Sequence, residues 1–284
     1  MLTLMASAKI NLALHVVGRR ADGYHLLDSL VTFADVGDFL SAKLALELTL
    51  DVTGPYGSEL GSGEDNLVMR AARLMQSEAA DLGAGRPGAA LTLIKFLPVA
   101  SGLGGGSADA AETMHVLNML WDLELTLERL QQFGLDLGAD VPMCLAGKPA
   151  RVEGIGEKVT PIGPLPGMAL VLVNPGVPVS TPDVFRALAK RDHPPLPTLP
   201  ASWEGLDHLV DWLRSTRNDL EAPAIGIAPA IGDVLQTLAA TPGCLLARMS
   251  GSGATCFGIF PDRNAAERAA ATIRAAHLDW WVET

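Results

Sequence analysis

The segment Pro98–Ala108 is the part of the chain whose composition most directly suggests chemistry. Glycine stands at positions 102, 104, 105 and 106, and apolar residues then recur at helical spacing from Ala110 to Leu120. Glycine lets the main chain adopt positive φ angles and approach a ligand closely. The start of a helix presents unpaired N–H groups and a partial positive charge to an anion. The pattern therefore predicts a phosphate-binding loop that leads into a helix.

The two commonest phosphate-binding motifs do not fit this loop. A P-loop requires Gly-Lys-Ser/Thr, which does not occur here. A dinucleotide-binding loop requires glycines spaced G-x-G-x-x-G, whereas Ser107 stands at the third glycine position. A flexible turn that packs a helix closely on a sheet is the alternative interpretation. Four glycines next to Ser107 and Asp109 favour phosphate binding, but they do not indicate which reaction takes place.

Two charged residues far from this loop are candidates for acid–base chemistry. Lys9 lies in Ala8-Lys-Ile-Asn-Leu12, where strand alternation places Lys9 and Asn11 on one face. Such a lysine reaches either the edge of the strand or a polar site, and the spacing does not choose between them. Asp140 lies in Gly138-Ala-Asp-Val-Pro142, which by itself favours a helix N-cap with Pro142 in the first turn. That position is compatible with catalysis, because a helix N-terminus keeps a carboxylate ionised.

A further small-residue segment, Ser250-Gly-Ser-Gly-Ala-Thr-Cys256, lies between two expected strands. It is either a tight hairpin or a second group of main-chain donors that faces the first glycine loop.

The composition limits the class of protein. A chain of 284 residues with 49% hydrophobic residues is expected to form two domains or one bilobal unit. Its net charge of −11 argues against a surface that coats nucleic acid or an anionic membrane. The cysteines, at 144, 244 and 256, contain no C-x-x-C pair, which favours three buried thiols over a disulfide framework or a zinc site. No signal peptide or membrane-spanning run is recognised, so a soluble, cytoplasmic protein is expected.

The hydrophobic periodicity indicates which elements position these residues. Strands are expected at 4–17, 24–33, 42–52, 91–97, 150–152, 159–162, 170–173, 244–249 and 255–260. Helices are expected at 66–80, 107–120, 127–133, 181–190, 205–215, 229–239 and 264–276. Strands that look antiparallel, followed by packed helices, indicate an α+β fold. A boundary is expected near 163–167, between domains 1–162 and 163–284, and the proline-rich segment 191–203 is expected to be a connecting loop.

Three segments, Ala8–Leu12, Pro98–Ala111 and Ser250–Thr255, occur in an order that resembles the GHMP kinase superfamily. Five others resemble its branch that acts on a cytidine-diphosphate alcohol of the non-mevalonate isoprenoid route: Arg20–His25, Gly138–Pro142, Asn174-Pro175, Thr181–Phe185 and Arg217–Leu220. The resemblance implies two domains: an N-terminal ATP-binding and catalytic α/β domain like ribosomal protein S5, and a C-terminal α+β sandwich that contributes to substrate binding. It implies transfer of the γ-phosphoryl group of ATP, with Mg²⁺, to the 2-hydroxyl of the methylerythritol moiety.

The resemblance also implies roles for individual residues. Asp140 would accept the hydroxyl proton, and Lys9 would align it and offset developing charge. The implied ATP contacts are Lys95 on the adenine side and Pro98, Val99, Ala100, Ser101, Gly102, Leu103, Gly104, Gly105, Gly106, Ser107 and Ala108. The implied substrate contacts are Asn11, Tyr24, His25, Asp140, Thr181 and Phe185, with Phe185 stacking on the cytosine. Ser107 is a candidate ligand of Mg²⁺, and no acidic ligand is named.

Two departures from the family pattern and several alternatives remain. Val99-Ala100-Ser101 stands where many relatives carry further glycine, and Val141–Leu145 replaces a more aromatic run. The alternatives are a mevalonate- or homoserine-type kinase, an inactive nucleotide-binding module, and a dehydrogenase that uses an acidic residue at 122 or 124. Lys9 and Asp140 argue against an inactive module. The expected partner is a small molecule, for a monomer or weak homodimer.

Overall fold

A computed structural model describes all residues, 1–284. Its contacts divide the chain into two compact units that interleave along the sequence. Unit 1 comprises Met1–Lys9, Gly37–Val99 and Gly104–Lys148, and unit 2 comprises Ile10–Val36, Ala100–Leu103 and Pro149–Thr284. The expected domains, 1–162 and 163–284, are each continuous in sequence, unlike these units. The boundary between them stays a prediction.

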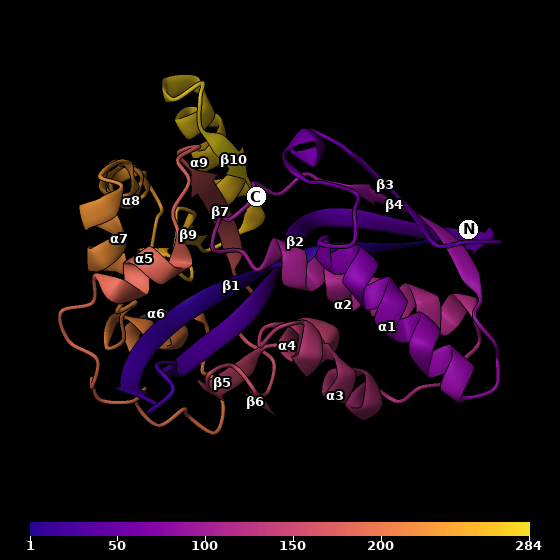
Figure 1. Cartoon of the computed structure of the whole chain (residues 1–284). Coiled ribbons are helices and arrows are strands. Elements are labelled where there is room, and N and C mark those ends of the chain that lie inside the picture. Colours follow the sequence, from indigo (N-terminus) through magenta and orange to yellow (C-terminus); the bar gives the residue numbers. More distant parts are fainter. The chain divides into compact units, whose positions relative to one another are not determined.

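Two long strands contribute residues to both units. They are β1 (Leu2–Arg19) and β2 (His25–Ala45), drawn in indigo and violet in Figure 1. The turn between them is closed by the N–H of Arg20, which donates to the carbonyl of Tyr24 at 2.7 Å.

Unit 1 contains a sheet in the order β3-β4-β2, formed by β3 (Thr49–Thr53), β4 (Gly88–Ile94) and the end of β2. β4 is antiparallel to β2 and parallel to β3. The single strand expected at 42–52 is therefore wrong. The chain must reverse between Ala45 and Thr49 to reach the other edge of β4, and the alternation of apolar residues across this point hides the reversal.

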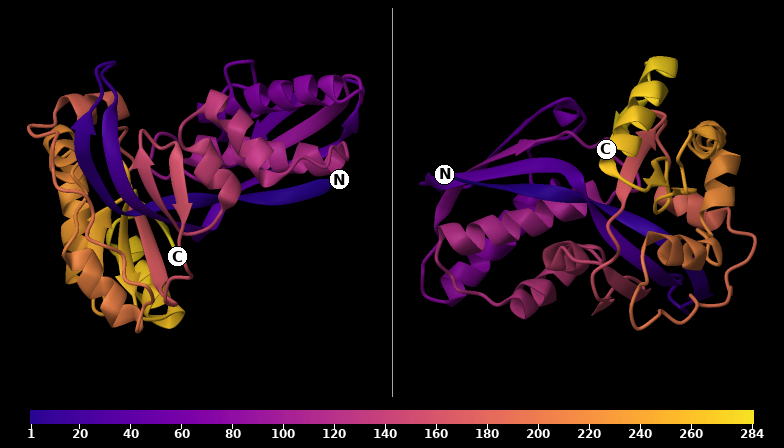
Figure 2. Two further views of the ribbon diagram at one scale, coloured as in Figure 1. Left: turned by 90° about the horizontal axis from the view of Figure 1, so that it is seen from below. Right: turned by 180° about the vertical axis from the view of Figure 1, so that it is seen from behind.

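The helices of unit 1 are α1 (Leu67–Asp81), α2 (Gly105–Leu120), α3 (Leu127–Leu137) and α4 (Val141–Ala146), with a 3₁₀ turn η1 (Gly57–Glu59). α3 and α4 pack on each other and on α1 and α2. α1 begins at Asn66, whose side chain caps the helix by accepting from the N–H of Val68. α1 and α2 lie side by side on one face of the sheet (Figures 1 and 2). α2 begins two residues before the expected start, so Gly105 and Gly106 form its first turn.

Unit 2 contains a second sheet in the order β10-β7-β9-β8. Its strands are β7 (Ala169–Asn174), β8 (Leu246–Met249), β9 (Cys256–Phe260) and β10 (Trp281–Glu283). β5 (Ala150–Gly154) pairs with the first half of β2, and β6 (Lys158–Pro161) pairs with β5. Most of these pairs are antiparallel, unlike the parallel sheet of a dinucleotide-binding dehydrogenase. The α+β class is confirmed.

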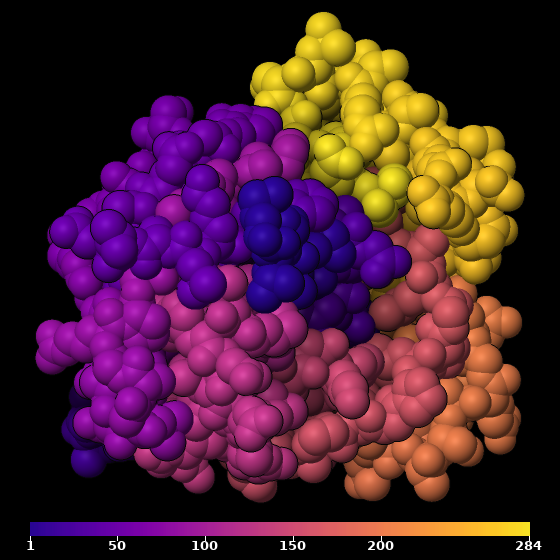
Figure 3. All heavy atoms as spheres, turned by 90° about the vertical axis from the view of Figure 1, so that its right-hand side faces the viewer, coloured from indigo at the N-terminus to yellow at the C-terminus, as the bar shows by residue number.

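The helices of unit 2 are α5 (Thr181–Arg186), α6 (Leu206–Arg214), α7 (Glu221–Ile227), α8 (Ala230–Ala240) and α9 (Arg263–Ala276). Val171, Ile231, Phe260 and Ile273 belong to the core that joins α8 and α9 to the sheet. α9, in yellow, is seen at the surface of this unit in Figure 3. None of the helices in the structure combines the length and apolar character that crossing a bilayer requires.

The proline-rich segment 191–203 is a loop, as expected, and main-chain hydrogen bonds hold it along β1 and β2. The N–H of His193 donates to the carbonyl of Val16 at 2.9 Å. The N–H of Leu196 donates to Asp28 Oδ2 at 2.8 Å, and the Pro194 carbonyl lies 2.9 Å from His15 Nδ1. The loop is therefore anchored at successive residues although it has no regular structure.

Candidate active site

Lys9 and Asp140 meet in unit 1. Lys9 Nζ donates to Asp140 Oδ2 at 3.1 Å, and the two side chains are 7% and 39% exposed. Lys9 lies on β1 between fully buried Ala8 and Ile10, so its side chain reaches a polar site rather than the strand edge. The pair combines an ammonium held by its surroundings with a carboxylate that solvent or a ligand can reach.

Asp140 occupies the N-cap of α4, with Pro142 in the first turn, as the sequence indicates. Its side chain makes no capping hydrogen bond. The carboxylate turns to Lys9 instead, which leaves it available for chemistry. One turn later, burial raises the pKa of the Cys144 thiol and the Asp140 charge adds to the rise. Cys144 is therefore a protonated, buried thiol and not a nucleophile.

The beginning of α2 lies against the same lysine. Gly104 is the N-cap of this 16-residue helix, has φ = 65°, and provides no side chain to cap the first N–H groups. A Cβ atom at Gly104 would lie 3.2 Å from Lys9 Cε. Glycine is thus favoured here both by the left-handed backbone and by the close approach of the lysine. Lys9 consequently contacts both Asp140 and the helix N-terminus that the sequence predicts to bind phosphate.

A second lysine, Lys95, lies beneath the next residue of α2. It is 2% exposed, and its Nζ donates to Asp109 Oδ2 at 2.7 Å and to Asp38. Asp38 Oδ1 also accepts from the N–H groups of Phe96 and Leu97, at 2.6 and 2.8 Å. This buried ion cluster, defined as Lys95, Asp38 and Asp109, gives no support to the implied contact of Lys95 with adenine, because the ammonium is enclosed and fully engaged.

The charges of the buried ion cluster shift each other's pKa. Burial acts to lower the pKa of Lys95, but Asp109 and Asp38 outweigh it, and the pKa is raised. Burial raises the pKa of Asp109 to about 7, against the attraction of Lys95 and with the help of Asp38. Two carboxylates share one ammonium here. Asp109 accepts fewer hydrogen bonds than Asp38, so burial destabilises its ionised form more strongly. Its Oδ1 atom is buried without a hydrogen-bond partner.

In unit 2 the loop residues 100–103 pack on the segment between β8 and β9. Ser250 Oγ donates to the carbonyl of Gly102 at 3.1 Å, and the N–H of Thr255 donates to the carbonyl of Ser101 at 3.0 Å. A Cβ atom at Gly102 would collide with the carbonyl oxygen of Ser250. Residues 250–255 thus connect two strands and also lie against residues 101–102 of the glycine loop, and their role as a group of main-chain donors stays a prediction.

Two asparagines support this loop, and one of them has no place among the predicted site residues. Asn218 Nδ2 donates to the carbonyls of Met249 and Gly251, at 2.8 Å each. Asn11, a predicted substrate contact, donates from Nδ2 to Ser29 Oγ at 2.8 Å, while its Oδ1 is buried without a partner. The only sequence signal for Asn218 is its place in Arg217–Leu220, a segment whose chemistry the sequence does not explain.

His25 and Phe185 stack on each other in unit 2. Their ring centroids are 4.8 Å apart, with an angle of 18° between the planes. Burial lowers the pKa of His25, and the charges of Arg19 and Arg191 lower it further. Thr181, at the start of α5, shares a hydrogen bond of 2.7 Å with Ser252. Tyr24 is 62% exposed. The structure thus joins two of the residues assigned to the cytosine and leaves Tyr24 open to solvent.

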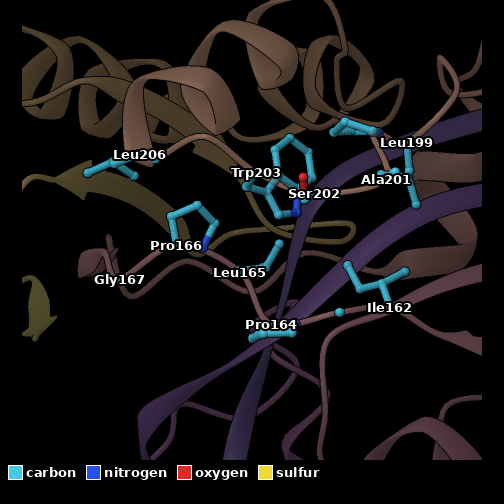
Figure 4. A pocket seen from close by; sticks show the side chains of 13 residues that line it. Ile162, Pro164, Leu165, Pro166, Gly167, Leu199, Ala201, Ser202, Trp203 and Leu206 are labelled. Atoms are coloured by element: carbon cyan, nitrogen blue, oxygen red, sulfur yellow. The ribbon is translucent and has the colours of Figure 1, made fainter.

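A cavity of about 730 Å³ lies elsewhere in unit 2 (Figure 4). Two segments, 162–167 and 199–206, form its largely apolar wall, with the ring of Trp203 on one side. None of the predicted site residues lines it. The described residues also contain no group of three or more His, Cys, Asp or Glu side chains placed to hold a metal.

Comparison with known proteins gives the class to which this site belongs. The family model "GHMP kinases N terminal domain" matches residues 66–148, and "GHMP kinases C terminal" matches residues 201–278. A crystal structure of homoserine kinase from Cytophaga hutchinsonii shares the fold, with a TM-score of 0.69 at 19% identity over 99% of this chain and 94% of that one. The fold and the two matches are those of a GHMP kinase.

Closer relatives narrow the class. The 4-diphosphocytidyl-2-C-methyl-D-erythritol kinase of Cereibacter sphaeroides is 54% identical over 98% of this chain and 96% of its own length. The kinase of the same name from Chelativorans sp. is 51% identical over 99% and 94%. A crystal structure of 4-(cytidine 5'-diphospho)-2C-methyl-D-erythritol kinase has a TM-score of 0.80 at 33% identity over 99% and 98%. The chain belongs to the family of 4-diphosphocytidyl-2-C-methyl-D-erythritol kinases.

Proposed function

We propose that the protein transfers the γ-phosphoryl group of ATP to the 2-hydroxyl of 4-diphosphocytidyl-2-C-methyl-D-erythritol. The observation that carries this proposal is the double contact of Lys9 with Asp140 and with Gly104 at the start of α2. A reachable carboxylate, an ammonium and a helix N-terminus meet around one side chain. The carboxylate can act as a base, the ammonium as a cation, and the helix N-terminus as an anion site. The identity of the alcohol is inferred from the names of the relatives.

Asp140 acts as the general base in this proposal. Phosphoryl transfer passes through a loose transition state, so the protein mainly positions groups and stabilises charge. A carboxylate is a weak base, but the hydroxyl becomes acidic as its bond to phosphorus forms, and an ionised, oriented Asp140 is then sufficient. Lys9 holds the carboxylate at 3.1 Å and offsets negative charge on the transferred group.

The start of α2 holds the nucleotide phosphates. The free N–H groups of its first turn and its dipole attract phosphate oxygens, and no side chain competes for those N–H groups. In such enzymes Mg²⁺ binds only one or two protein oxygens, together with phosphate and water. A magnesium site of this kind does not need a cluster of three or more ligating side chains, and the structure contains no such cluster. The half-buried hydroxyl of Ser107, in this turn, would hold the ion. Bound Mg²⁺ would neutralise charge on the phosphates.

His25 and Phe185 receive the cytidine, with Thr181 and Asn11 as further contacts. Aromatic rings supply stacking area to a base, and a neutral imidazole supplies one donor and one acceptor for its edge. The lowered pKa of His25 favours this neutral form. Exposed Tyr24 is placed one residue from His25 and would close over the base from solvent. We place the reaction in the cytoplasm, where the three free cysteines would stay reduced.

A substrate panel tests the proposal. The purified protein is given MgATP and equal concentrations of 4-diphosphocytidyl-2-C-methyl-D-erythritol, mevalonate or homoserine, and phosphorus NMR follows the phosphate ester. The cytidine-diphosphate alcohol is expected to be the only good acceptor. Faster turnover of mevalonate or homoserine would assign the chain to another GHMP kinase. ATP binding with no turnover of any acceptor would make it an inactive nucleotide-binding module.

A further inference from the structure

Arg191 is a cation without a partner at the start of the proline-rich loop. Its Nε is buried without a hydrogen-bond partner, and no hydrogen bond or ion pair engages its guanidinium. Nine other arginines form ion pairs with carboxylates. Five further arginines form no ion pair, at positions 19, 70, 86, 248 and 268, but Arg191 is the one whose guanidinium has a buried atom without a hydrogen-bond partner. A buried donor without an acceptor costs about 1–3 kcal/mol, which indicates that a ligand supplies the acceptor.

Arg191 lies within electrostatic reach of the aromatic stack formed by His25 and Phe185. Its charge is one of the causes that lower the pKa of His25, after burial and Arg19. His25 Nε2 is also buried without a partner. Arg19, the other nearby cation, is exposed and donates to the carbonyl of Gly23 at 3.0 Å. His25 Nε2 and Arg191 Nε are therefore both buried without a partner, and of the two cations Arg191 is the one that makes no hydrogen bond.

The loop holds Arg191 in place. Two residues further on, the N–H of His193 is bound to the carbonyl of Val16 on β1, and Leu196 is bound to Asp28 on β2. The same pair of strands carries His25, the first residue of β2. The main chain that follows Arg191 is therefore held against the two strands beside His25, so little of the loop has to be ordered when a ligand arrives.

We propose that Arg191 is a further substrate-recognition residue whose guanidinium binds the diphosphate of the cytidine-diphosphate substrate, an inference that rests on the proposed function. Guanidinium is planar and presents paired donors that match phosphate oxygens, with which it forms charge-assisted hydrogen bonds. A cytidine stacked at His25 and Phe185 carries its diphosphate on the same nucleoside, and Arg191 lies in the loop that is bound to the two strands beside His25. The role explains why this loop begins with an arginine that no carboxylate neutralises.

Two variants of Arg191 and one control test the assignment. Arg191→Met removes the charge and keeps an unbranched stem, and Arg191→Lys keeps the charge without the paired donors. Arg186→Met is the control, because it removes a nearby, exposed arginine that is paired with Asp183. Steady-state kinetics give kcat and KM for both substrates, and calorimetry gives the dissociation constants of cytidine, CMP and CDP.

For Arg191→Met we expect the KM of the cytidine-diphosphate substrate to rise about 10–100-fold, the loss typical of a charge-assisted contact. The KM of ATP and kcat should change less than threefold. Binding of CDP should weaken most, that of CMP less, and that of cytidine within twofold. Arg191→Lys should recover part of the affinity for CDP, and Arg186→Met should match the wild type.

Equal weakening of cytidine and CDP would overturn the assignment, because the residue would then act on the base or on the fold. An unchanged KM in Arg191→Met would also overturn it. If Arg191→Met does not fold, the assignment is tested with Arg191→Lys, whose affinity loss should increase from cytidine to CMP to CDP. Failure of the wild type to phosphorylate the substrate would contradict the proposed function, whereas the binding series of cytidine, CMP and CDP tests Arg191 separately.

Discussion

Unit 1 places two lysines against consecutive residues at the start of α2, and the two have opposite environments. Lys9 lies at Gly104 and binds one carboxylate, Asp140, which is 39% exposed. Lys95 lies at Gly105 and binds two carboxylates that are almost completely buried. The same pair of functional groups therefore occurs twice beside one helix N-terminus. What differs is whether a ligand can reach the carboxylate.

The difference in exposure determines which property each lysine controls. A partly exposed ion pair contributes about 0–1 kcal/mol to stability, because water solvates the exposed partner, here Asp140, when Lys9 is removed. Removing one member of a buried pair costs about 3–5 kcal/mol, because the remaining charge has no solvent. We therefore expect the Lys9–Asp140 pair to govern turnover and the buried ion cluster to govern the position and stability of the first turn of α2.

The largest expected effect is on turnover, in Asp140→Asn. The amide cannot accept the hydroxyl proton, so kcat should fall by about 10²–10⁴-fold, the usual contribution of a general base. The dissociation constant of ATP, measured by calorimetry, should change little. Asp136→Asn, an exposed aspartate at the end of α3, is the matched control and should keep the wild-type kcat. A wild-type rate in Asp140→Asn would remove the assignment of Asp140 as the base.

The next effect is on folding, in Lys95→Met. This substitution leaves Asp38 and Asp109 buried side by side without their cation, and the free energy of unfolding in urea should fall by about 3–5 kcal/mol. Lys9→Met is the same substitution at the lysine whose carboxylate partner is exposed, and it should lower this free energy by only ~1 kcal/mol. Equal losses in the two variants would show that exposure does not separate the two lysines.

Local sequence signals were sufficient to predict the helix N-terminus that both lysines contact and the neighbouring helix α1. Four closely spaced glycines predict a loop that enters a helix, and Asn66 with its apolar period predicts α1 to within a residue at each end. Lys9 and Asp140 are 131 positions apart. No spacing rule connects a strand residue with a distant N-cap. The prediction that Lys9 and Asp140 act together therefore came from the resemblance to a family.

The buried ion cluster could not be predicted, because its members come from three elements and no local pattern marks them. Asp38 lies inside a long strand and is 57 positions from Lys95, so only tertiary structure brings them together. α7 was missed because Pro223 and Gly226 interrupt its seven residues, and β10 because three residues show no period. The reversal after Ala45 was missed because apolar alternation continues across it.

A smaller effect is expected when a methyl group is added beside each lysine. A Cβ atom at Gly105 would lie 2.9 Å from Lys95 Nζ, which two carboxylates hold in place. Gly105→Ala should therefore cost about 1–3 kcal/mol in urea unfolding, despite the higher helix propensity of alanine. Gly104→Ala should cost ~1 kcal/mol for its positive φ, while the flexible stem of Lys9 yields. Its larger effect should be on kcat, because the displaced stem carries the ammonium that orients Asp140.

If instead Gly105→Ala were as stable as the wild type, the Lys95 ammonium would have to be free to move. The expected contrast with Lys9, whose stem can yield to an added methyl group, would then fail. Amide hydrogen exchange of residues 104–107 gives a second measure. Exchange should become faster in Gly105→Ala, because the first turn of α2 is pushed away from the buried ion cluster.

The last expected effect is a pH dependence of stability to which Asp109 of the buried ion cluster contributes. Burial raises the pKa of Asp109 from 3.8 to about 7 in the folded protein. The folded state therefore holds this proton more tightly than the unfolded chain. The stability contributed by the protonated carboxyl is complete below pH 4 and is lost as the pH rises through 7. Asp109→Asn, which has no proton to lose, should lack this slope.

The quantity to measure is the free energy of unfolding of the wild type minus that of Asp109→Asn, by urea titration between pH 5 and 8. The difference should fall as the pH rises, by at most ~1.4 kcal/mol per pH unit, the limit for one proton, and should level off above pH 7. A difference that stays constant between pH 5 and 8 would mean that Lys95 keeps Asp109 ionised throughout, as it is in the unfolded chain. In that case the attraction of Lys95 would outweigh burial, and the two lysine sites would differ in exposure but not in how they hold their carboxylates.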